Sequence, residues 1–183
     1  MNVLMINGSP HKNGLGRQVL SIISEELSGL GISSRIYDAA DFNGGGCRAC
    51  RACKTGSGCV LGDLAELSEI FMHASGIIIS SPVYYASPSG TLISLLDRLF
   101  QSTKFDKRMK VGAAFVTARR GGCTASLDAL YKYFAISEMP IATSNYWNLI
   151  HTEEDKEGER TARILAKNMA FLMKSIELGS SQL

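Results

Sequence analysis

Short runs of apolar residues alternate along the chain with longer segments in which apolar residues recur every three or four positions. A continuous apolar run bounded by turn residues is typical of a strand covered on both faces, whereas the wider spacing indicates an amphipathic helix. The runs predict strands at 2–7, 32–37, 76–81 and 111–117, and a weaker fifth strand at 141–144.

Helical spacing lies between and after these runs. The first such segment follows a glycine-rich loop and stops at Gly29 and Gly31. Asp63, with Glu66 three residues later, has the pattern of a capping box, which predicts a helix from there to His73. Further helices are predicted over 89–100, 126–134 and 155–176.

The composition agrees with one domain. With 183 residues, 45% of them hydrophobic, the chain can bury a full-sized core. The strand and helix units follow one another without a break in composition. We therefore predict one α/β domain over residues 1–183, in which a doubly wound, five-stranded parallel sheet lies between two layers of helices.

Charge and hydropathy exclude two classes of partner. Nineteen basic and seventeen acidic residues give a net charge of +2 without a basic run, so we expect no nucleic-acid partner. The longest apolar stretch, around 77–79, is too short to cross a membrane. The chain starts without a charged leader or cleavage site, and its cysteines cluster in an odd total. We therefore expect a cytoplasmic protein in a reducing compartment.

Most of the cysteines lie in one long loop, predicted over residues 39–62, which is too long for a simple connection. The spacing is C-x2-C-x2-C-x5-C, formed by Cys47, Cys50, Cys53 and Cys59. Neighbouring thiolates are best neutralised by a metal, and this compact set suits the four corners of a cubane iron–sulfur cluster. Structural zinc usually takes two separated pairs. Zinc and reactive or regulatory thiols remain open as alternative interpretations.

Three further loops are candidates for a ligand site, because doubly wound sheets bind ligands beyond the carboxyl ends of their strands. Loop 8–16 is glycine-rich and precedes a helix whose N-terminus attracts anions, although it has neither the Walker A ending nor the spaced glycines of dinucleotide folds. Loop 80–85 brings a proline and two tyrosines that can cover a flat ring. Loop 118–122 adds two arginines and two glycines at the same edge.

The order of these motifs resembles the iron–sulfur flavoprotein branch of the NAD(P)H-dependent FMN reductases, which have a flavodoxin-like fold. The resemblance covers nearly the whole chain, and the order and spacing of its motifs make it specific. The motifs are GSPHKNG at 8–14, CRACRACKTGSGC at 47–59, SPVYYASPSG at 81–90 followed by Asp97 and Arg98, ARRGG at 118–122, and NYWN at 145–148.

The resemblance implies that all three loops bind FMN. It assigns the phosphate to Ser9, Pro10, Asn13, Gly14, Leu15 and Gly16. It assigns the isoalloxazine ring to Pro82, Val83, Tyr84 and Tyr85, with Ala118, Arg119, Arg120, Gly121 and Gly122 closing over its edge. Relatives commonly carry asparagine and then serine or threonine where this chain has Leu15 and Gly16, so backbone amides must replace two side chains there.

The resemblance further implies that Cys47, Cys50, Cys53 and Cys59 ligate a [4Fe–4S] cluster, and that Cys123 is structural. It implies a homodimer or homotetramer, NAD(P)H as electron donor, and a small molecule or ferredoxin-like carrier as acceptor. Since the flavin carries the chemistry, no catalytic acid–base residue is expected. Two alternatives stay open: a cluster-free FMN or quinone reductase with redox-active thiols, and a zinc-holding binding module without enzymatic activity.

Overall fold

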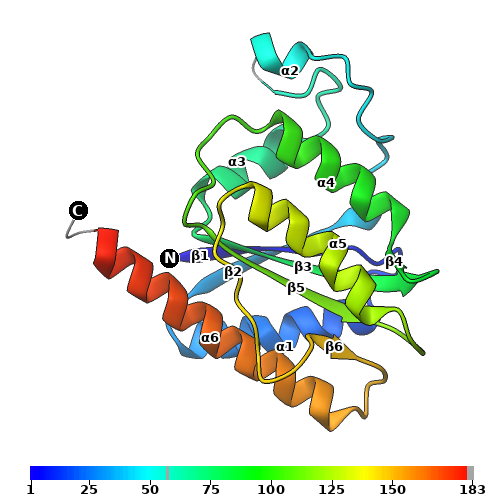
Figure 1. The fold of residues 1–183 in the computed structure, drawn as a ribbon, viewed down its shortest axis with the longest axis vertical. Helices are drawn as coiled ribbons and strands as arrows, with labels where there is room; N and C mark the ends of the chain where they lie inside the picture. The colour runs from blue at the N-terminus through cyan, green and yellow to red at the C-terminus, as the bar shows by residue number, and fades with distance from the viewer. Residues whose placement is uncertain (57, 181–183) are drawn as a thin grey trace.

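The computed structural model describes residues 1–56 and 58–180 and shows a parallel sheet between two layers of helices (Figure 1). The sheet order is β2-β1-β3-β5-β6, which is the strand order of the flavodoxin-like, doubly wound fold. Its parallel strands are β1 (Asn2–Asn7), β2 (Ser33–Asp38), β3 (Gly76–Tyr84), β5 (Val111–Thr117) and β6 (Leu149–Ile150). A short strand, β4 (Ser87–Pro88), pairs antiparallel with the end of β3.

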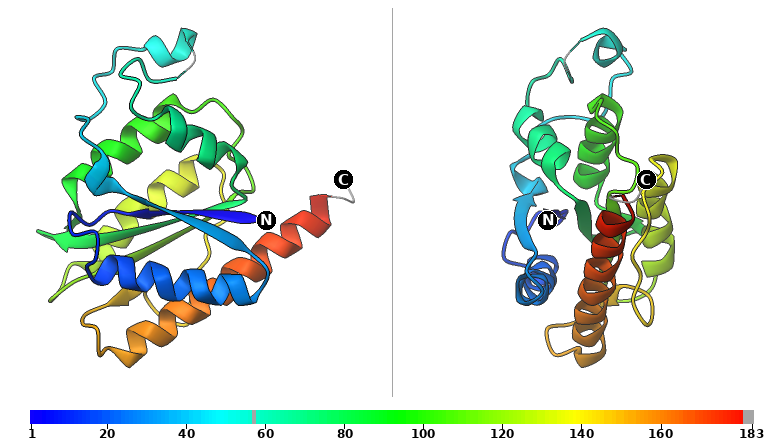
Figure 2. Two further views of the ribbon diagram at one scale, coloured as in Figure 1. Left: turned by 180° about the vertical axis from the view of Figure 1, so that it is seen from behind. Right: turned by 90° about the vertical axis from the view of Figure 1, so that its left-hand side faces the viewer.

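The helices cover both faces of the sheet (Figures 1 and 2). One face carries α1 (Leu15–Gly29) and α6 (Lys156–Ser180). The other face carries α3 (Ala65–His73), α4 (Gly90–Ser102) and α5 (Cys123–Ile136). Within the described residues, no helix is both long and apolar enough to span a membrane.

Two hydrophobic cores explain the continuous apolar runs in the sequence. Successive side chains of a strand point to opposite faces. In β1, Leu4 and Ile6 therefore join the core under α3, α4 and α5, whereas Val3 and Met5 join the core under α1 and α6. All four are at most 1% exposed. A strand covered on both faces has no polar side to alternate with, which is why the runs predict buried parallel strands correctly.

The predicted fifth strand at 141–144 is wrong. There the chain makes only an isolated bridge between Gly112 and Ile141, and the regular pairing with β5 occurs later, at β6. Asn148 accounts for the displacement, because its buried side-chain amide donates to the carbonyl of Ala114 at 3.0 Å. A side chain thus satisfies a β5 carbonyl that a neighbouring strand would otherwise pair.

The predicted capping box at Asp63 is also wrong, although its helix ends at His73 as expected. Helix α3 begins at Ala65, after the N-cap residue Leu64, and the described residues provide no side-chain hydrogen bond to this cap. The Asp63 carboxylate instead forms an ion pair with Arg98 on α4. A buried guanidinium attracts a carboxylate more strongly than a helix N-terminus does.

The side chain of Asp155 connects the end of β6 to the start of α6 by hydrogen bonds. Replacing it is expected to destabilise the fold. Its two oxygens accept from the backbone amides of His151 and Gly158, each at 2.9 Å, and these hydrogen bonds hold the pKa of Asp155 below its usual range. Asp155→Ala should lower the free energy of unfolding by about 1–2 kcal/mol at pH 7, as for other lost N-caps.

Urea unfolding of the wild type and of Asp155→Ala at several pH values tests this expectation. A carboxyl whose pKa is depressed on folding stabilises above its unfolded pKa, about 3.9, and this contribution is lost as the pH falls through the folded value. The difference between the two proteins should therefore shrink below about pH 4. Asp155→Asn, which keeps a capping oxygen, is the matched control. Equal stabilities at pH 7 would contradict the capping role.

Candidate functional site

The three candidate loops meet at one edge of the sheet. In the parallel register Asn7 pairs with Ser80 and Pro82 pairs with Thr117, so β1, β3 and β5 end side by side. The amide of Gly8 donates to the carbonyl of Ser80 at 2.7 Å. We call this edge, formed by residues 8–16, 80–86 and 118–122, the rim.

The first loop presents the N-terminus of α1 to the rim. Gly14 is the N-cap residue, and among the described residues no side chain caps it. The amides of the first helical residues, Leu15 and Gly16, have no intrahelical partner, and the helix dipole adds partial positive charge there. Gly16 is buried, and a Cβ there would lie 3.1 Å from Ser80 Oγ. The loop therefore offers backbone amides to an anion. This compensates for the polar side chains that relatives carry at positions 15 and 16 and that this chain lacks.

The remaining residues of the first loop differ in exposure. Ser9 is buried, and its hydroxyl accepts from the amide of His11 at 3.1 Å, which shapes the turn. Pro10 and Asn13 are exposed. Lys12 forms an ion pair with Asp41 at 2.5 Å, and this hydrogen bond raises the pKa of Lys12.

The second loop is shorter than predicted. The sequence predicts a strand that ends at residue 81, but β3 continues through Pro82 and Val83 to Tyr84 and turns back into β4. The two turn residues, Tyr85 and Ala86, have positive φ angles of 50° and 59°, the conformation of a type I′ hairpin turn. Tyr85 is fully exposed, and Tyr84 is nearly half exposed. The hairpin thus places two aromatic rings at the edge of the rim.

The third loop packs against this hairpin. Gly122 has φ +91°, and a Cβ there would lie only 2.7 Å from Ala86 Cα. Ala118 is buried, whereas Arg119, Arg120 and Gly121 are exposed. The structure therefore brings all three loops together, as their positions after neighbouring strands predict.

His151 is a neighbour of the rim that the sequence did not predict. Its Nδ1 lies 2.5 Å from the carbonyl of Ala118, so the residue after β6 supports the third loop. No signal in the sequence pointed to this position, because the strand that His151 follows, β6, was predicted at 141–144 instead.

The contrast between Gly121 and Gly122 gives a matched test of the rim. If the rim binds FMN, as the resemblance implies, Gly122→Ala should lower FMN affinity about tenfold or more, because a left-handed φ and a clash with Ala86 force the third loop away from the hairpin. Gly121→Ala adds a Cβ with nothing within 4 Å and should leave affinity unchanged. Flavin fluorescence titration measures both. Equal affinities for the two variants would show that the packing of these loops does not shape the site.

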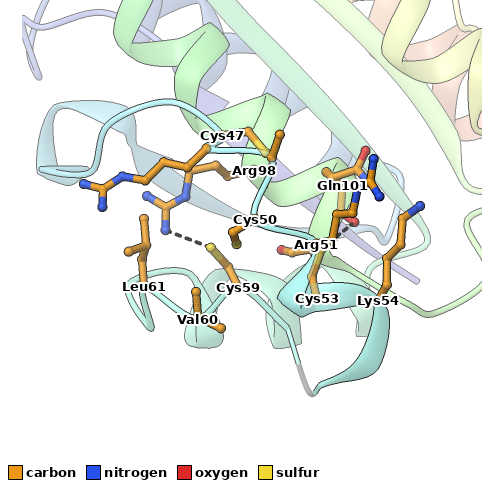
Figure 3. A pocket seen from close by; sticks show the side chains of 13 residues that line it. Cys47, Cys50, Arg51, Cys53, Lys54, Cys59, Val60, Leu61, Arg98 and Gln101 are labelled. Carbon is orange, nitrogen blue, oxygen red and sulfur yellow. Dashed lines mark hydrogen bonds between the residues drawn. The ribbon is translucent and has the colours of Figure 1, made fainter.

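The four clustered cysteines line a separate cavity of about 420 Å³ (Figure 3). Its walls come from the cysteine-rich segment, including the short helix α2 (Ala52–Thr55), and from the end of α4. This segment projects beyond α4, away from the sheet (Figures 1 and 2). Cys47 and Cys50 are exposed and Cys53 and Cys59 half-buried, and all four thiols are free. Cys123, the fifth, is buried at the start of α5, away from this cavity.

The donor set of this cavity fits an iron–sulfur cluster. In residues 1–56 and 58–180, no three His, Cys, Asp or Glu side chains lie close enough to hold a single metal ion. A cubane cluster needs its four thiolates farther apart than a single ion does, because they surround a group of iron and sulfur atoms. Four free thiols around one cavity meet that requirement.

Arg98 is a second feature of the site whose contacts the sequence did not reveal. Its guanidinium forms two hydrogen bonds with Asp63, with Nη1 2.9 Å from Oδ2 and Nη2 on Oδ1. Nη2 also donates to Cys59 Sγ at 3.2 Å (Figure 3). Arg98 holds the pKa of Asp63 below its usual range, and Asp63 raises the pKa of Arg98. A charged residue beside the apolar stripe of α4 was the available signal, because a buried charge needs a partner.

Comparison with known proteins places the chain in a family. The fold defines a flavodoxin-like protein: a WrbA-like flavodoxin from Agrobacterium tumefaciens superposes with a TM-score of 0.69, at 14% identity over 95% of this chain and 98% of that one. A flavodoxin from the domain Archaea gives a TM-score of 0.65, at 15% identity over 95% and 99%. Residues 1–154 match the NADPH-dependent FMN reductase family, and the chain belongs to it. It is therefore an FMN-dependent oxidoreductase.

Two curated relatives cover almost the whole chain. An iron–sulfur flavoprotein from Methanocaldococcus jannaschii is 31% identical over 196 residues, covering 97% of this chain and 100% of the relative. An iron–sulfur flavoprotein from Methanosarcina thermophila is 28% identical and covers 97% of each.

Proposed function

We propose that this protein is an electron-transfer flavoprotein that holds FMN at the rim and a [4Fe–4S] cluster in the cysteine cavity. The observation that carries the proposal is the position of four free thiols around one cavity in a chain of an FMN-dependent family. The names of the two full-length relatives, both iron–sulfur flavoproteins, support it.

The rim residues divide between the two ends of FMN. The α1 N-terminus receives the phosphate through the amides of Leu15 and Gly16, with Ser9, Pro10, Asn13 and Gly14 forming the turn. Residues Pro82–Tyr85 line the ring, and residues Ala118–Gly122 close its edge. When bound, FMN supplies two-electron and one-electron redox chemistry. The protein contributes binding, orientation and charge near the ring, the last from Arg119 and Arg120.

The redox partners follow from the two sites. NAD(P)H is the donor that the family description favours. A small oxidant or a ferredoxin-like carrier is the acceptor. Arg48, Arg51 and Lys54 line the cysteine cavity and are exposed, which gives an acidic carrier a complementary surface.

The separation of the two sites favours a homodimer or homotetramer. Ser89, the N-cap of α4, donates from its hydroxyl to the carbonyl of Gly8 in the rim at 2.6 Å, whereas Gln101, near the other end of the same helix, lines the cavity. Twelve residues of helix span about 18 Å, and electron transfer slows steeply with distance. A second copy that brings its cavity to this rim shortens the path. Five free thiols fit the reducing cytoplasm, where we place the protein.

A cluster-free NAD(P)H-dependent FMN or quinone reductase is the second candidate, favoured by the exposure of Cys47 and Cys50, which suits redox-active thiols. Anaerobic purification followed by iron, sulfide, zinc and flavin analysis distinguishes the candidates. The proposal predicts FMN with about four iron and four sulfide per chain. FMN without iron would establish the reductase, and zinc without flavin would establish a binding module.

A further inference from the structure

Arg98 is a buried positive charge in contact with Cys59, one of the four cysteines of the cavity. Among the residues that the structure describes, it is the only charged one that is buried, with 1% of its side chain exposed. Burying a guanidinium is costly unless its hydrogen-bonding groups are used. Asp63 satisfies part of this demand. The remaining contacts of Arg98 therefore indicate what else its position serves.

Those contacts reach both ends of the cysteine motif. Nη2 donates to Cys59, the last of the four cysteines, and Nη1 donates to the carbonyl of Gly45, two residues before the first, at 3.4 Å. A Cβ at Gly44 would overlap both Arg98 and Asp63, so the approach of the chain here requires glycine. The Phe42 ring lies 5.1 Å from the guanidinium carbon. One side chain on a rigid helix thus fixes where the motif begins and ends.

We propose that Arg98 is a positioning residue that sets the reduction potential of the cluster, through its N–H···S contact with Cys59, and that Asp63 moderates this effect. The inference rests on the proposed function, because it requires a cluster in the cavity. Reduction adds negative charge to a cluster, and hydrogen bonds to its sulfurs stabilise the reduced form and raise its potential. Arg98 supplies both a hydrogen bond and a positive charge at one corner of the cavity.

Asp63 is expected to have the opposite effect on the reduction potential of the cluster. Its carboxylate pairs with the same guanidinium that contacts Cys59, so it offsets the positive charge near the cluster. Removing the charge of Arg98 should therefore lower the potential, and removing the charge of Asp63 should raise it. A purely structural anchor behaves differently, because loss of either partner would loosen the loop and reduce the amount of bound cluster without opposite shifts in potential.

Anaerobic redox titration of the loaded protein, followed by electron paramagnetic resonance of the reduced cluster, tests the inference. At a fixed potential, Arg98→Gln should lower the ratio of reduced to oxidised cluster about tenfold, which is about 59 mV for a one-electron couple. Asp63→Asn should raise it. Arg108→Gln, which breaks an exposed ion pair with Asp106 away from the cavity, is the matched control and should not shift it.

The outcomes separate the inference from the proposed function. Wild-type protein without iron and sulfide overturns the function and with it the inference. Loaded variants whose potentials do not move, or move in the same direction, overturn only the role of Arg98. If Arg98→Gln does not load, Arg98→Lys replaces it, since lysine keeps the charge but not the fixed fork. Its potential should fall below that of the wild type, and an unchanged value would contradict the inference.

Discussion

Replacing Gly14 by aspartate is expected to lower FMN affinity about a hundredfold or more without destabilising the apoprotein. Gly14 is the N-cap of α1 and has the extended backbone of a capping residue, with φ −80° and ψ 179°. Aspartate is a favourable N-cap, so the helix loses nothing. Its carboxylate would stand where we propose that the phosphate binds, and two like charges about 4 Å apart repel by about 4 kcal/mol at an effective dielectric constant of 20.

Flavin fluorescence titration and urea unfolding of the same preparations measure the two effects of Gly14→Asp. Gly14→Asn is the control, because asparagine has nearly the same size and capping ability without the charge. It should retain most of the affinity. If aspartate and asparagine reduce affinity equally, steric crowding against His11, 3.3 Å from a Cβ at position 14, explains the loss instead of charge.

Replacing Cys50 by serine is expected to remove nearly all bound iron and sulfide while FMN remains bound. A serine hydroxyl does not ionise near neutral pH and is a poor substitute for a thiolate ligand. The cysteine cavity and the rim lie at opposite ends of α4, so loss of a ligand should leave the flavin site intact.

The control for Cys50→Ser is Cys123→Ser. Cys123 is buried at the start of α5 and does not line the cysteine cavity, so its replacement should leave the iron content unchanged. Iron, sulfide and flavin are quantified in the same anaerobic samples. Full iron in Cys50→Ser would rule out Cys50 as a ligand, and loss of flavin together with iron would show that the two sites are not independent.

The fold was largely predictable because its central strands, β1, β3 and β5, are buried on both faces. The runs at β1, β3 and β5 are continuous, and each was placed within the strand that the structure shows. The fifth strand escaped prediction for a tertiary reason. The side-chain amide of Asn148 donates to the backbone carbonyl of Ala114, and nothing in the local apolar pattern encodes such a long-range hydrogen bond.

The rim was predictable from topology, whereas the surroundings of the cysteines were not. Loops after neighbouring parallel strands must meet at one edge, and the contact of Gly122 with Ala86 shows that two of them touch. The spacing of Asp63 and Glu66 pointed to a local helix cap, but the carboxylate pairs with Arg98, 35 residues away. Local patterns describe short-range capping and cannot weigh it against a distant buried charge.

Hydrogen exchange of the apoprotein with and without FMN tests most directly whether the three strand-end loops form the flavin site. Ligand contact slows the exchange of amides that it covers or orders. Binding at the rim predicts slower exchange in peptides covering 8–16, 80–86 and 118–122 together. Protection confined to the cysteine-rich segment, or absent from any one of the three loops, would contradict the assignment.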